Sequence, residues 1–371
     1  MKIGIDARFF GTETGIGRYV KELIEHLEVI QSEHEFVIFL RKKNFDLYKP
    51  RNRKFKKVLA DIKWYGLAEQ VELPKILEKE KVDLMHFPHF NVPFLYKKPF
   101  VATIHDLILL KYPSTRATTL GPIKFFLKYL FYRLTIQRVA RDAKFIITPS
   151  EYIKKEVIKS FNKIEHKIIV TYEGVSFNLL DTECPTTTAV GHSVSYFLYV
   201  GNAYPHKNLE GLIKAFKIFR KYKNDKYKLV LVGKEDYFWR RLKKMAGNTE
   251  NIIFRGYVAD EELAELYQNT EAYIFPSFCE GFGLPGLEAM AHGTPVLASN
   301  SSCLSEIYGD AALYFNPQSI DEMVKKMSEI VYNPELRKNL IEKGYERVRK
   351  YSWSDCARQT LKVYEEAVSK I

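Results

Sequence analysis

Short apolar segments alternate with longer segments of helical periodicity along this chain, and this alternation limits the folds open to it. In the first half the apolar segments are Lys2–Asp6, Phe36–Leu40, Asp83–Phe87, Phe100–Ile104 and Phe145–Pro149. The helical segments between them are Ile16–Ile30, Tyr65–Lys79, where Pro74 could introduce a kink, and Thr119–Asp142. Strands that alternate with helices pair in parallel, and the helices cover both faces of the sheet. We therefore predict an α/β fold.

The same alternation starts again in the second half of the chain. Its predicted elements are Tyr196–Gly201, Leu209–Tyr222, Lys228–Gly233, Asn251–Arg255, Asp260–Gln268, Ala272–Phe275, Leu284–His292 and Pro295–Ser299. Between the two series, Asp181–His192 is polar and rich in turn-forming residues, which is typical of a linker. A chain of 371 residues exceeds what one hydrophobic core usually supports. We predict two doubly wound domains, residues 1–180 and 181–353, followed by a helix within Tyr351–Ile371.

Residues 277–291 (SFCEGFGLPGLEAMA) predict a loop that runs into a helix. Pro285 suits the first helical position, where a missing N–H costs nothing, and Gly293 ends the helix. A helix N-terminus behind a glycine-rich loop is a site for phosphate, because its N–H groups have no partner within the helix. Glu280 lies ahead of this N-terminus, and Glu288 lies about one turn into the helix. This order suits a sugar at Glu280, a diphosphate in the middle and a ribose at Glu288.

The spacing of these two acids, with seven residues between them, resembles the E-x7-E signature of retaining glycosyltransferases of GT-B architecture, especially glycosyltransferase family 4. The flanking residues Phe275-Pro276-Ser277 fit the family as well. At the N-terminus, Asp6-Ala7-Arg8 and Gly15-Ile16-Gly17-Arg18-Tyr19 match the family's opening, where a glycine-rich loop approaches the donor and the acceptor. The resemblance extends over nearly the whole chain.

This resemblance implies two Rossmann-like domains that face each other across a cleft, with the last helix, about residues 354–371, crossing back onto the first domain. It implies that residues 1–180 bind the acceptor and that residues 181–353 bind a nucleotide-diphosphate sugar. The expected reaction retains the anomeric configuration by front-face attack, in which a phosphate oxygen of the donor accepts the proton of the acceptor. The sequence has no D-x-D motif. Enzymes of this architecture generally need no metal, and we expect no cofactor.

The resemblance also assigns the site residues. His105, Lys207 and Glu280 are the expected catalytic residues. The expected donor-binding and nucleotide-binding residues are Gly15, Gly17, Asn202, Lys207, Val258, Gly281, Phe282, Gly283, Leu284 and Glu288. Lys207 matches the family's diphosphate-binding lysine. Such a cation is needed because negative charge builds on the diphosphate as it leaves. Many relatives have an arginine where this chain has Asn202 or His206, which leaves the second cation open between His206 and Arg8. The base contacts within Phe254–Val258 are mostly made by backbone, which hides the identity of the base.

Each assignment has a purely structural alternative. The loop before the helix could be a tight turn capped by Glu280, with Glu288 on a solvated helix face. Gly15 and Gly17 also fit an ordinary strand-to-helix turn, and Lys207 fits a surface lysine. His105 beside Asp106 fits a hydrogen-bonded structural pair. A pair of glycosidase acids is disfavoured, because a glycosidase needs both carboxyl groups at one glycosidic bond.

Two further histidines follow the same pattern as His105. His86 and His89 lie at the end of the apolar segment Asp83–Phe87. They either line the ligand site or pack within a loop.

The positive charge of the chain lies in its first half. Residues 1–180 carry 32 Lys and Arg against 20 Asp and Glu, whereas the remaining residues carry 25 of each. Such an asymmetry indicates an anionic partner, either nucleic acid or a membrane surface. The four cysteines form no C-x-x-C pair, which argues against a zinc or redox motif. With no secretory signal before Asp6 and no apolar run of the ~18–20 residues that span a bilayer, we expect a cytoplasmic protein.

Two basic segments favour the membrane over nucleic acid. Arg41–Lys57 is strongly basic, and Ile123–Val139 combines aromatic and aliphatic residues with a predicted polar stripe at Lys124, Lys128, Thr135 and Arg138. Such a helix suits a lipid interface. The alternative is a helix packed on the sheet of the first domain. We expect peripheral contact with the inner face of the cytoplasmic membrane, where a lipid-linked acceptor would lie, and no nucleic-acid partner.

The sequence therefore predicts a retaining glycosyltransferase that acts on a glycan or lipid-linked acceptor in cell-surface polysaccharide or glycolipid synthesis. The opening motif and Pro205-His206-Lys207-Asn208 resemble the mannosyltransferase-like members most, which favours GDP-mannose and leaves UDP-sugars open. Two rivals remain. One is a non-catalytic protein of the same fold that docks on a membrane or nucleic acid, which the intact Glu280, Glu288 and Lys207 disfavour. The other is a sugar-nucleotide epimerase, which needs no acceptor.

Overall fold

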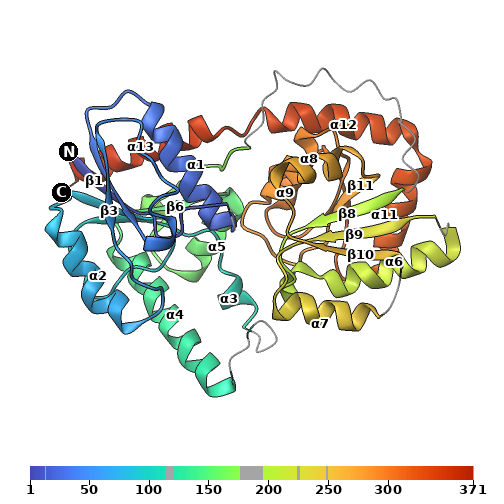
Figure 1. The fold of residues 1–371 in the computed structure, drawn as a ribbon, viewed down its shortest axis with the longest axis horizontal. Coiled ribbons are helices and arrows are strands. Elements are labelled where there is room, and N and C mark those ends of the chain that lie inside the picture. Colours follow the sequence, from blue (N-terminus) through green and yellow to red (C-terminus); the bar gives the residue numbers. More distant parts are fainter. Residues whose placement is uncertain are drawn as a thin grey trace. The chain divides into compact units, whose positions relative to one another are not determined.

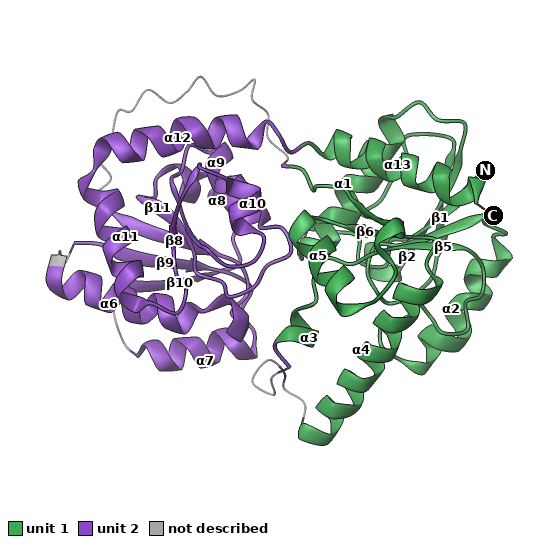
Figure 2. Ribbon diagram, turned by 180° about the vertical axis from the view of Figure 1, so that it is seen from behind, with its two compact units in different colours: residues 1–111, 121–174, 352–371 green, residues 112–120, 175–351 purple. Residues whose placement is uncertain are grey.

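The computed structural model describes residues 1–12, 14–113, 118, 121–175, 195–223, 226–247 and 250–370. The chain divides into two compact units (Figure 2). Unit 1 comprises residues 1–111, 121–174 and 352–371, and unit 2 comprises residues 112–120 and 175–351. The linker predicted at residues 181–192 lies outside the described residues.

Unit 1 is built on a parallel sheet of seven described strands in the order β3-β2-β1-β4-β5-β6-β7 (Figure 1). The strands are β1 (Lys2–Asp6), β2 (Glu35–Leu40), β3 (Phe55–Leu59), β4 (Leu84–Phe87), β5 (Phe100–Thr103), β6 (Phe145–Thr148) and β7 (Ile168–Val170). The helices are α1 (Gly15–Val29), α2 (Leu67–Lys79), α3 (Ile108–Lys111), α4 (Pro122–Asp142), α5 (Glu151–Ser160) and α13 (Trp353–Ser369). Short 3₁₀ turns occur at Lys42–Asn44 (η1) and Glu165–Lys167 (η3).

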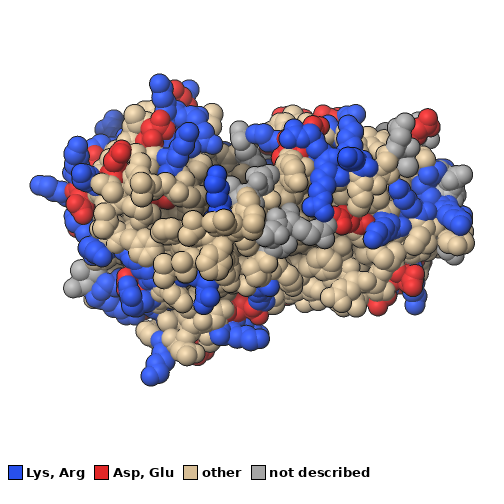
Figure 3. All heavy atoms as spheres, turned by 90° about the horizontal axis from the view of Figure 1, so that it is seen from below, with Lys and Arg blue, Asp and Glu red and all other residues tan. Residues whose placement is uncertain are grey.

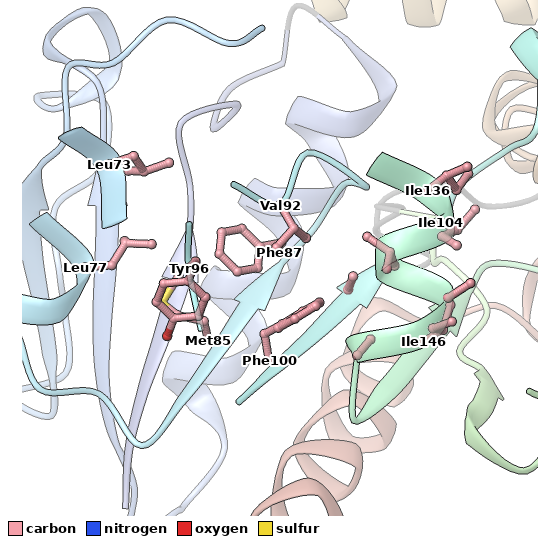
Figure 4. Close-up of a cluster of buried hydrophobic side chains, with 14 of the residues drawn as sticks. Leu73, Leu77, Met85, Phe87, Val92, Tyr96, Phe100, Ile104, Ile136 and Ile146 are labelled. Atoms are coloured by element: carbon pink, nitrogen blue, oxygen red, sulfur yellow. The ribbon is translucent and has the colours of Figure 1, made fainter. Parts of the chain in front are cut away.

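Helices cover both faces of this sheet. On one face the core joins α2 and α4 to β4, β5 and β6, through residues such as Leu73, Ile136, Phe87, Phe100 and Ile146 (Figure 4). On the other face α13 packs against α1 and against β4, β5 and β6. The last helix therefore returns to the first domain, as the sequence predicts.

Unit 2 repeats the same topology. Six described strands form a parallel sheet in the order β10-β9-β8-β11-β12-β13. The strands are β8 (Tyr196–Val200), β9 (Lys228–Val232), β10 (Ile252–Gly256), β11 (Ala272–Phe275), β12 (Val296–Ser299) and β13 (Ala312–Phe315). The helices are η4 (Pro205–Lys207), α6 (Leu209–Lys223), α7 (Tyr237–Ala246), α8 (Asp260–Gln268), α9 (Leu284–Ala291), α10 (Leu304–Tyr308), α11 (Ile320–Tyr332) and α12 (Pro334–Val348).

Several elements lie outside the sequence prediction. The basic segment Arg41–Lys57 contains most of β3, which the prediction missed because its lysines interrupt the apolar pattern of a strand. This strand lies at the edge of the sheet, where lysines are common because they discourage pairing with other chains. The prediction also lacked β7, β13 and the helices α3, α5, α7, α10, α11 and α12.

The predicted polar stripe of α4 is wrong at Arg138. This side chain is buried and donates hydrogen bonds to the carbonyl oxygens of Pro93 and Tyr96. Burial lowers the pKa of its guanidinium, although Asp142 opposes the shift. The second half of α4 belongs to the core of unit 1, whereas its first half is exposed.

Candidate functional site

Apart from the additional edge strand β7 of unit 1, the two sheets have the same strand order, and that order locates the candidate site in each unit. In a doubly wound sheet, ligands bind at the carboxyl ends of the strands where the order reverses. In unit 1 this point lies between β1 and β4, and in unit 2 it lies between β8 and β11. Lys207 follows β8 and Glu280 follows β11, so the topology brings these two residues together.

Lys207 and Glu280 form an ion pair in unit 2. Lys207 Nζ lies 2.7 Å from Oε1 and 2.8 Å from Oε2 of Glu280. The two side chains are only 15% and 9% exposed, so the pair is shielded from water. A shielded cation beside a shielded carboxylate can bind phosphate oxygens on one side and hydroxyl groups on the other. The surface-lysine alternative for Lys207 is wrong.

The loop that carries Glu280 is held from behind by α10 and the residues before it. Cys303 Sγ donates to the carbonyl oxygens of Glu280 and Phe282, each at 3.3 Å. Tyr308 Oη donates to the Gly283 carbonyl oxygen at 2.6 Å. Ser302 Oγ accepts from the Glu280 N–H at 3.0 Å. These contacts from outside the motif fix the backbone of the predicted donor loop.

Gly283 is required by this arrangement. Its φ of 105° lies in the left-handed region, and a Cβ there would lie 2.5 Å from Tyr308 Oη. Gly283 is also the N-cap of α9, and the predicted helix bounds are close to those observed. Leu284 occupies the first helical position, so Pro285 stands at the second position rather than at the predicted first one.

Glu288 lies on α9 and is partly buried. Tyr267 Oη lies 3.5 Å from its Oε2. The helix ends at His292, and Gly293 follows with a φ of 70°. The predicted order of loop carboxylate, helix N-terminus and helix carboxylate is therefore present in the structure.

The loop after β8 supplies further predicted residues. Asn202 is exposed, and its carbonyl oxygen accepts from Tyr199 Oη at 2.7 Å. Burial, followed by the charge of Lys207, lowers the pKa of His206 to about 4. A neutral His206 offers no second cation at neutral pH. Val258, which follows the left-handed Gly256, is buried in unit 2.

Arg8 lies in the core of unit 1. It is fully buried and forms ion pairs at 2.8 Å with Asp6 and with Glu69. Its guanidinium already has two anionic partners, so Arg8 is not the second diphosphate cation in this arrangement.

The two glycines of the N-terminal loop differ. A Cβ on Gly17 would lie 2.8 Å from the Phe9 carbonyl oxygen, so this position excludes a side chain. Thr14 Oγ1 accepts from the Gly17 N–H at 3.0 Å and caps α1. Gly15 has open space where its Cβ would be. Close packing therefore explains Gly17, whereas a Cβ on Gly15 would have nothing within 4 Å.

His105, in unit 1, has a partner that the sequence did not reveal. Its Nδ1 lies 3.2 Å from Oε1 of Glu173, and its Nε2 lies 2.9 Å from the Pro88 carbonyl oxygen. The ring meets Tyr19 edge to face, with 4.7 Å between centroids. Glu173 is 68 residues away along the chain and follows β7, the strand that the prediction lacked. Recognising β7 would have placed Glu173 at the same sheet edge as His105.

His86 is a structural residue. It is fully buried between Tyr364 Oη at 2.7 Å and Thr103 Oγ1 at 2.8 Å, and so links α13 to the sheet. Burial, with a smaller effect from the charge of His105, lowers the pKa of His86 to about 3. Burial and, to a smaller extent, the charge of His105 also lower the pKa of His89 to about 3. The Nδ1 atom of His89 lies 2.9 Å from Asn91 Oδ1. Both rings are neutral at neutral pH.

Two protein-family models match the chain. The model described as Glycosyltransferase Family 4 matches residues 14–179, and the model described as Glycosyl transferases group 1 matches residues 189–347. The O-antigen chain mannosyltransferase B of Escherichia coli is 28% identical over 95% of this chain and 96% of its own. The O-antigen chain mannosyltransferase RfbU of Salmonella typhimurium is 29% identical over 70% of this chain and 68% of its own.

Solved structures share the fold. Sucrose-phosphate synthase from Thermosynechococcus elongatus superposes with a TM-score of 0.77 at 18% identity and covers 100% of both chains. HepE from Anabaena, in complex with UDP and glucose, superposes with a TM-score of 0.74 at 16% identity over 99% of this chain and 100% of its own. With two such parallel sheets and both family models in chain order, this protein is a GT-B glycosyltransferase that belongs to glycosyltransferase family 4.

Proposed function

We propose that this protein transfers a mannosyl residue, with retention of configuration, from GDP-mannose to a glycan or lipid-linked acceptor in cell-surface polysaccharide or glycolipid synthesis. The ion pair of Lys207 and Glu280 carries the proposal, because it places a cation and a carboxylate beside the N-terminus of α9. The names of the E. coli and Salmonella relatives support mannose and O-antigen. Unit 2 binds the donor in this proposal, and unit 1 binds the acceptor.

The mechanism follows from the charges of the site. The donor diphosphate lies at the N-terminus of α9 and takes Lys207 as its cation. Glu280 binds hydroxyl groups of the sugar, and Glu288 binds those of the ribose. The bond from the anomeric carbon to the phosphate oxygen breaks while the acceptor oxygen bonds to the same face of that carbon. The acceptor's proton moves to an oxygen of the leaving diphosphate. We propose that no metal takes part, because Lys207 supplies positive charge where the diphosphate departs.

Donor binding must rearrange the ion pair. Lys207 now neutralises Glu280 at 2.7 and 2.8 Å. A diphosphate carries more negative charge than one carboxylate and competes for the same ammonium. As Lys207 turns to the diphosphate, the carboxylate of Glu280 is released to accept from sugar hydroxyls. Binding of the two halves of the donor is therefore coupled through one side chain.

Purified protein tests the proposal directly. A thermal-shift series with GDP, UDP and ADP is expected to show the largest increase in melting temperature with GDP, because a ligand of the native state stabilises it. With GDP-mannose and an acceptor, NMR of the product is expected to show the α-anomer, and EDTA is expected to leave the rate unchanged. A larger shift with UDP, a β-linked product or loss of activity in EDTA would each refute the corresponding part.

The same assay separates the two rivals. A non-catalytic binding protein would leave every nucleotide sugar intact. An epimerase would convert the sugar nucleotide in the absence of an acceptor.

We also propose that the first half of α4 contacts the inner face of the cytoplasmic membrane. None of the helices formed by the described residues combines the length and apolar character that a membrane-spanning helix requires. The exposed apolar residues of α4 are Ile123, Phe126, Leu127, Leu130, Phe131 and Leu134, which we call the α4 apolar face. Figure 3 views unit 1 from the side on which α4 projects and shows basic side chains around a largely uncharged area. Exposed apolar side chains among lysines suit an anionic bilayer.

Replacing Phe126 and Phe131 together with serine is expected to reduce binding to anionic vesicles by about tenfold or more, since each phenylalanine loses roughly 1.5–3 kcal/mol of burial. The two side chains are 64% and 63% exposed, so the fold does not depend on them. Vesicle sedimentation measures this binding. The parent protein is expected to bind neutral vesicles less than anionic ones, and to bind anionic vesicles less in ~1 M salt.

A matched control replaces Tyr222 and Tyr332 of unit 2, which are 70% and 57% exposed, with serine. This control should bind vesicles as the parent does. Lysine neutralisation within Arg41–Lys57 is a poorer test, because Lys57 Nζ donates to the carbonyl oxygens of Phe45 and Tyr48 and supports the fold. Equal binding to neutral and anionic vesicles, or none to either, would leave α4 without a membrane role.

A further inference from the structure

Tyr308, the last residue of α10, packs against the N-terminus of α9 in unit 2. The side chain is fully buried, and its Oη donates to the Gly283 carbonyl oxygen at 2.6 Å. A Cβ on Gly283 would lie 2.5 Å from this Oη, and a Cβ on Gly286 would lie 2.3 Å from it. The phenol ring therefore lies directly against both glycines, and neither position can carry a side chain while Tyr308 stays in place.

This packing accounts for the glycine at position 286, in the first turn of α9. Glycine within a helix is less stable than alanine, because its backbone loses more freedom on folding. Here the methyl group of an alanine would collide with Tyr308. Glycines at 281, 283 and 286 also leave the backbone of this segment permissive, so its conformation depends on contacts from outside it.

The contact of Tyr308 fixes the direction of one backbone N–H. The Gly283 carbonyl belongs to the same planar peptide group as the Leu284 N–H, and in a trans peptide these two groups point in opposite directions. The carbonyl oxygen accepts from Tyr308 Oη and, at 3.2 Å, from the Gly286 N–H, which uses both of its lone pairs. The Leu284 N–H is therefore directed away from Tyr308, at the N-terminus of α9.

This N–H is available to a ligand. Within the described part of the chain, no atom accepts a hydrogen bond from the Leu284 N–H, and the next residue, Pro285, has no N–H. A hydrogen bond to the carbonyl of an amide polarises the group and strengthens its N–H as a donor. The hydroxyl of Tyr308 remains a donor, because burial raises its pKa well above the ordinary value.

The backbone beside Tyr308 is held in place by α12 and the residues after it. Arg347, on α12, donates to the carbonyl oxygen of Ile307 at 2.6 Å. Tyr351 Oη donates to the same oxygen at 3.0 Å. Two side chains thus fix the end of α10, and the phenol of Tyr308 connects that fixed point to the loop before α9.

We propose that Tyr308 is a positioning residue that holds the Leu284 N–H toward the diphosphate of the donor. This inference rests on the proposed function, which places the diphosphate at the N-terminus of α9. The hydroxyl does not touch the ligand, since it lies on the carbonyl side of the peptide group. Its effect is confined to ligands that carry phosphate, and it grows as negative charge builds on the leaving diphosphate.

The test is Tyr308→Phe, which removes one oxygen and keeps the ring against the two glycines. The Gly283 carbonyl keeps its contact with the Gly286 N–H, so the fold persists. In calorimetric titrations, affinity for GDP is expected to fall about tenfold, whereas affinity for guanosine, which has no phosphate, should stay within about twofold. At saturating donor, kcat for transfer is expected to fall about tenfold or more.

Nitrogen-15 NMR reports on the N–H itself. The protein is labelled at leucine, and the amide resonance of Leu284 is assigned with Leu284→Met. Saturating GDP is expected to shift this amide proton downfield in the parent and to shift it less in Tyr308→Phe. A purely structural role of Tyr308 would lower the melting temperature of the variant and leave the GDP-induced shift as it is in the parent.

The control is Tyr314→Phe, which removes a hydroxyl that donates to the Gly309 carbonyl oxygen at 2.7 Å, just after α10. This variant should bind GDP as the parent does. Equal losses of GDP and guanosine affinity in Tyr308→Phe, or parent-like values of GDP affinity and kcat, would overturn the proposal. If the parent binds UDP and not GDP, the proposed donor fails, and the same comparison with UDP and uridine decides the role of Tyr308. A parent that binds no nucleoside diphosphate would overturn both.

Discussion

Glu280→Gln is expected to lower kcat for sugar transfer by about 10²–10³-fold, while the affinity for the nucleoside diphosphate does not fall below that of the parent. Glutamine keeps the size of the side chain but removes the negative charge that would face the positive charge developing on the sugar. It also releases Lys207, whose Nζ lies 2.7 Å from the carboxylate, for the diphosphate. Steady-state kinetics and calorimetric titration with the nucleoside diphosphate measure the two quantities.

Glu288→Gln is the matched comparison, because it makes the same replacement of a carboxylate oxygen by an amide nitrogen in the other acid of the motif. It should weaken nucleoside diphosphate binding by about 10- to 150-fold, the equivalent of one charge-assisted hydrogen bond of roughly 1.5–3 kcal/mol. A reversed result, with Glu280→Gln weakening the diphosphate and Glu288→Gln leaving it unchanged, would exchange the two roles. A parent-like kcat for Glu280→Gln would remove that residue from the chemistry.

The local motifs were predictable because each places its residues on one loop or helix turn. Glycines, a proline and two acids within residues 277–291 specify a loop, a helix start and the spacing of Glu280 from Glu288 without reference to the rest of the chain. The alternation of strands and helices likewise gave the fold class, since parallel sheets need helical crossovers. Lys207 meets Glu280 because their strands are neighbours in that topology.

The supporting residues were not predictable, because their roles depend on contacts across the fold. Cys303 and Tyr308 hold carbonyl groups that lie 21 to 25 residues away, and Glu173 meets His105 across 68 residues. Strand β3 was missed because its lysines break the apolar pattern, and its edge position is a tertiary property. For Arg138, helical periodicity indicated a polar stripe, but carbonyl groups of the loop after β4 provide buried acceptors.

Arg8→Met is expected to cost unit 1 about 3–5 kcal/mol of its unfolding free energy at pH 8, because it removes one partner of a buried ionic network. The guanidinium is fully buried and binds Asp6 and Glu69, each at 2.8 Å, so both carboxylates would lose their cation. Urea denaturation, followed by hydrogen exchange of peptides from β1 and α2, measures the stability of unit 1. Arg358→Met on α13 is the control, since its ion pair with Asp355 is exposed and should contribute less than about 1 kcal/mol.

The loss caused by Arg8→Met should depend on pH in a defined direction. Burial already raises the pKa of Glu69 above its ordinary value of 4.5, and the charge of Arg8 opposes this shift. A carboxyl group with a raised pKa binds more protons in the folded state, so the unfolding free energy falls as pH rises through the range between the two values. Without Arg8 that range extends upward, and the loss should be larger at pH 8 than at pH 5. Adding Glu69→Gln should recover part of it at pH 8, because one uncompensated carboxylate is gone. An equal loss at both pH values, or no recovery, would show that Arg8 stabilises unit 1 by packing alone.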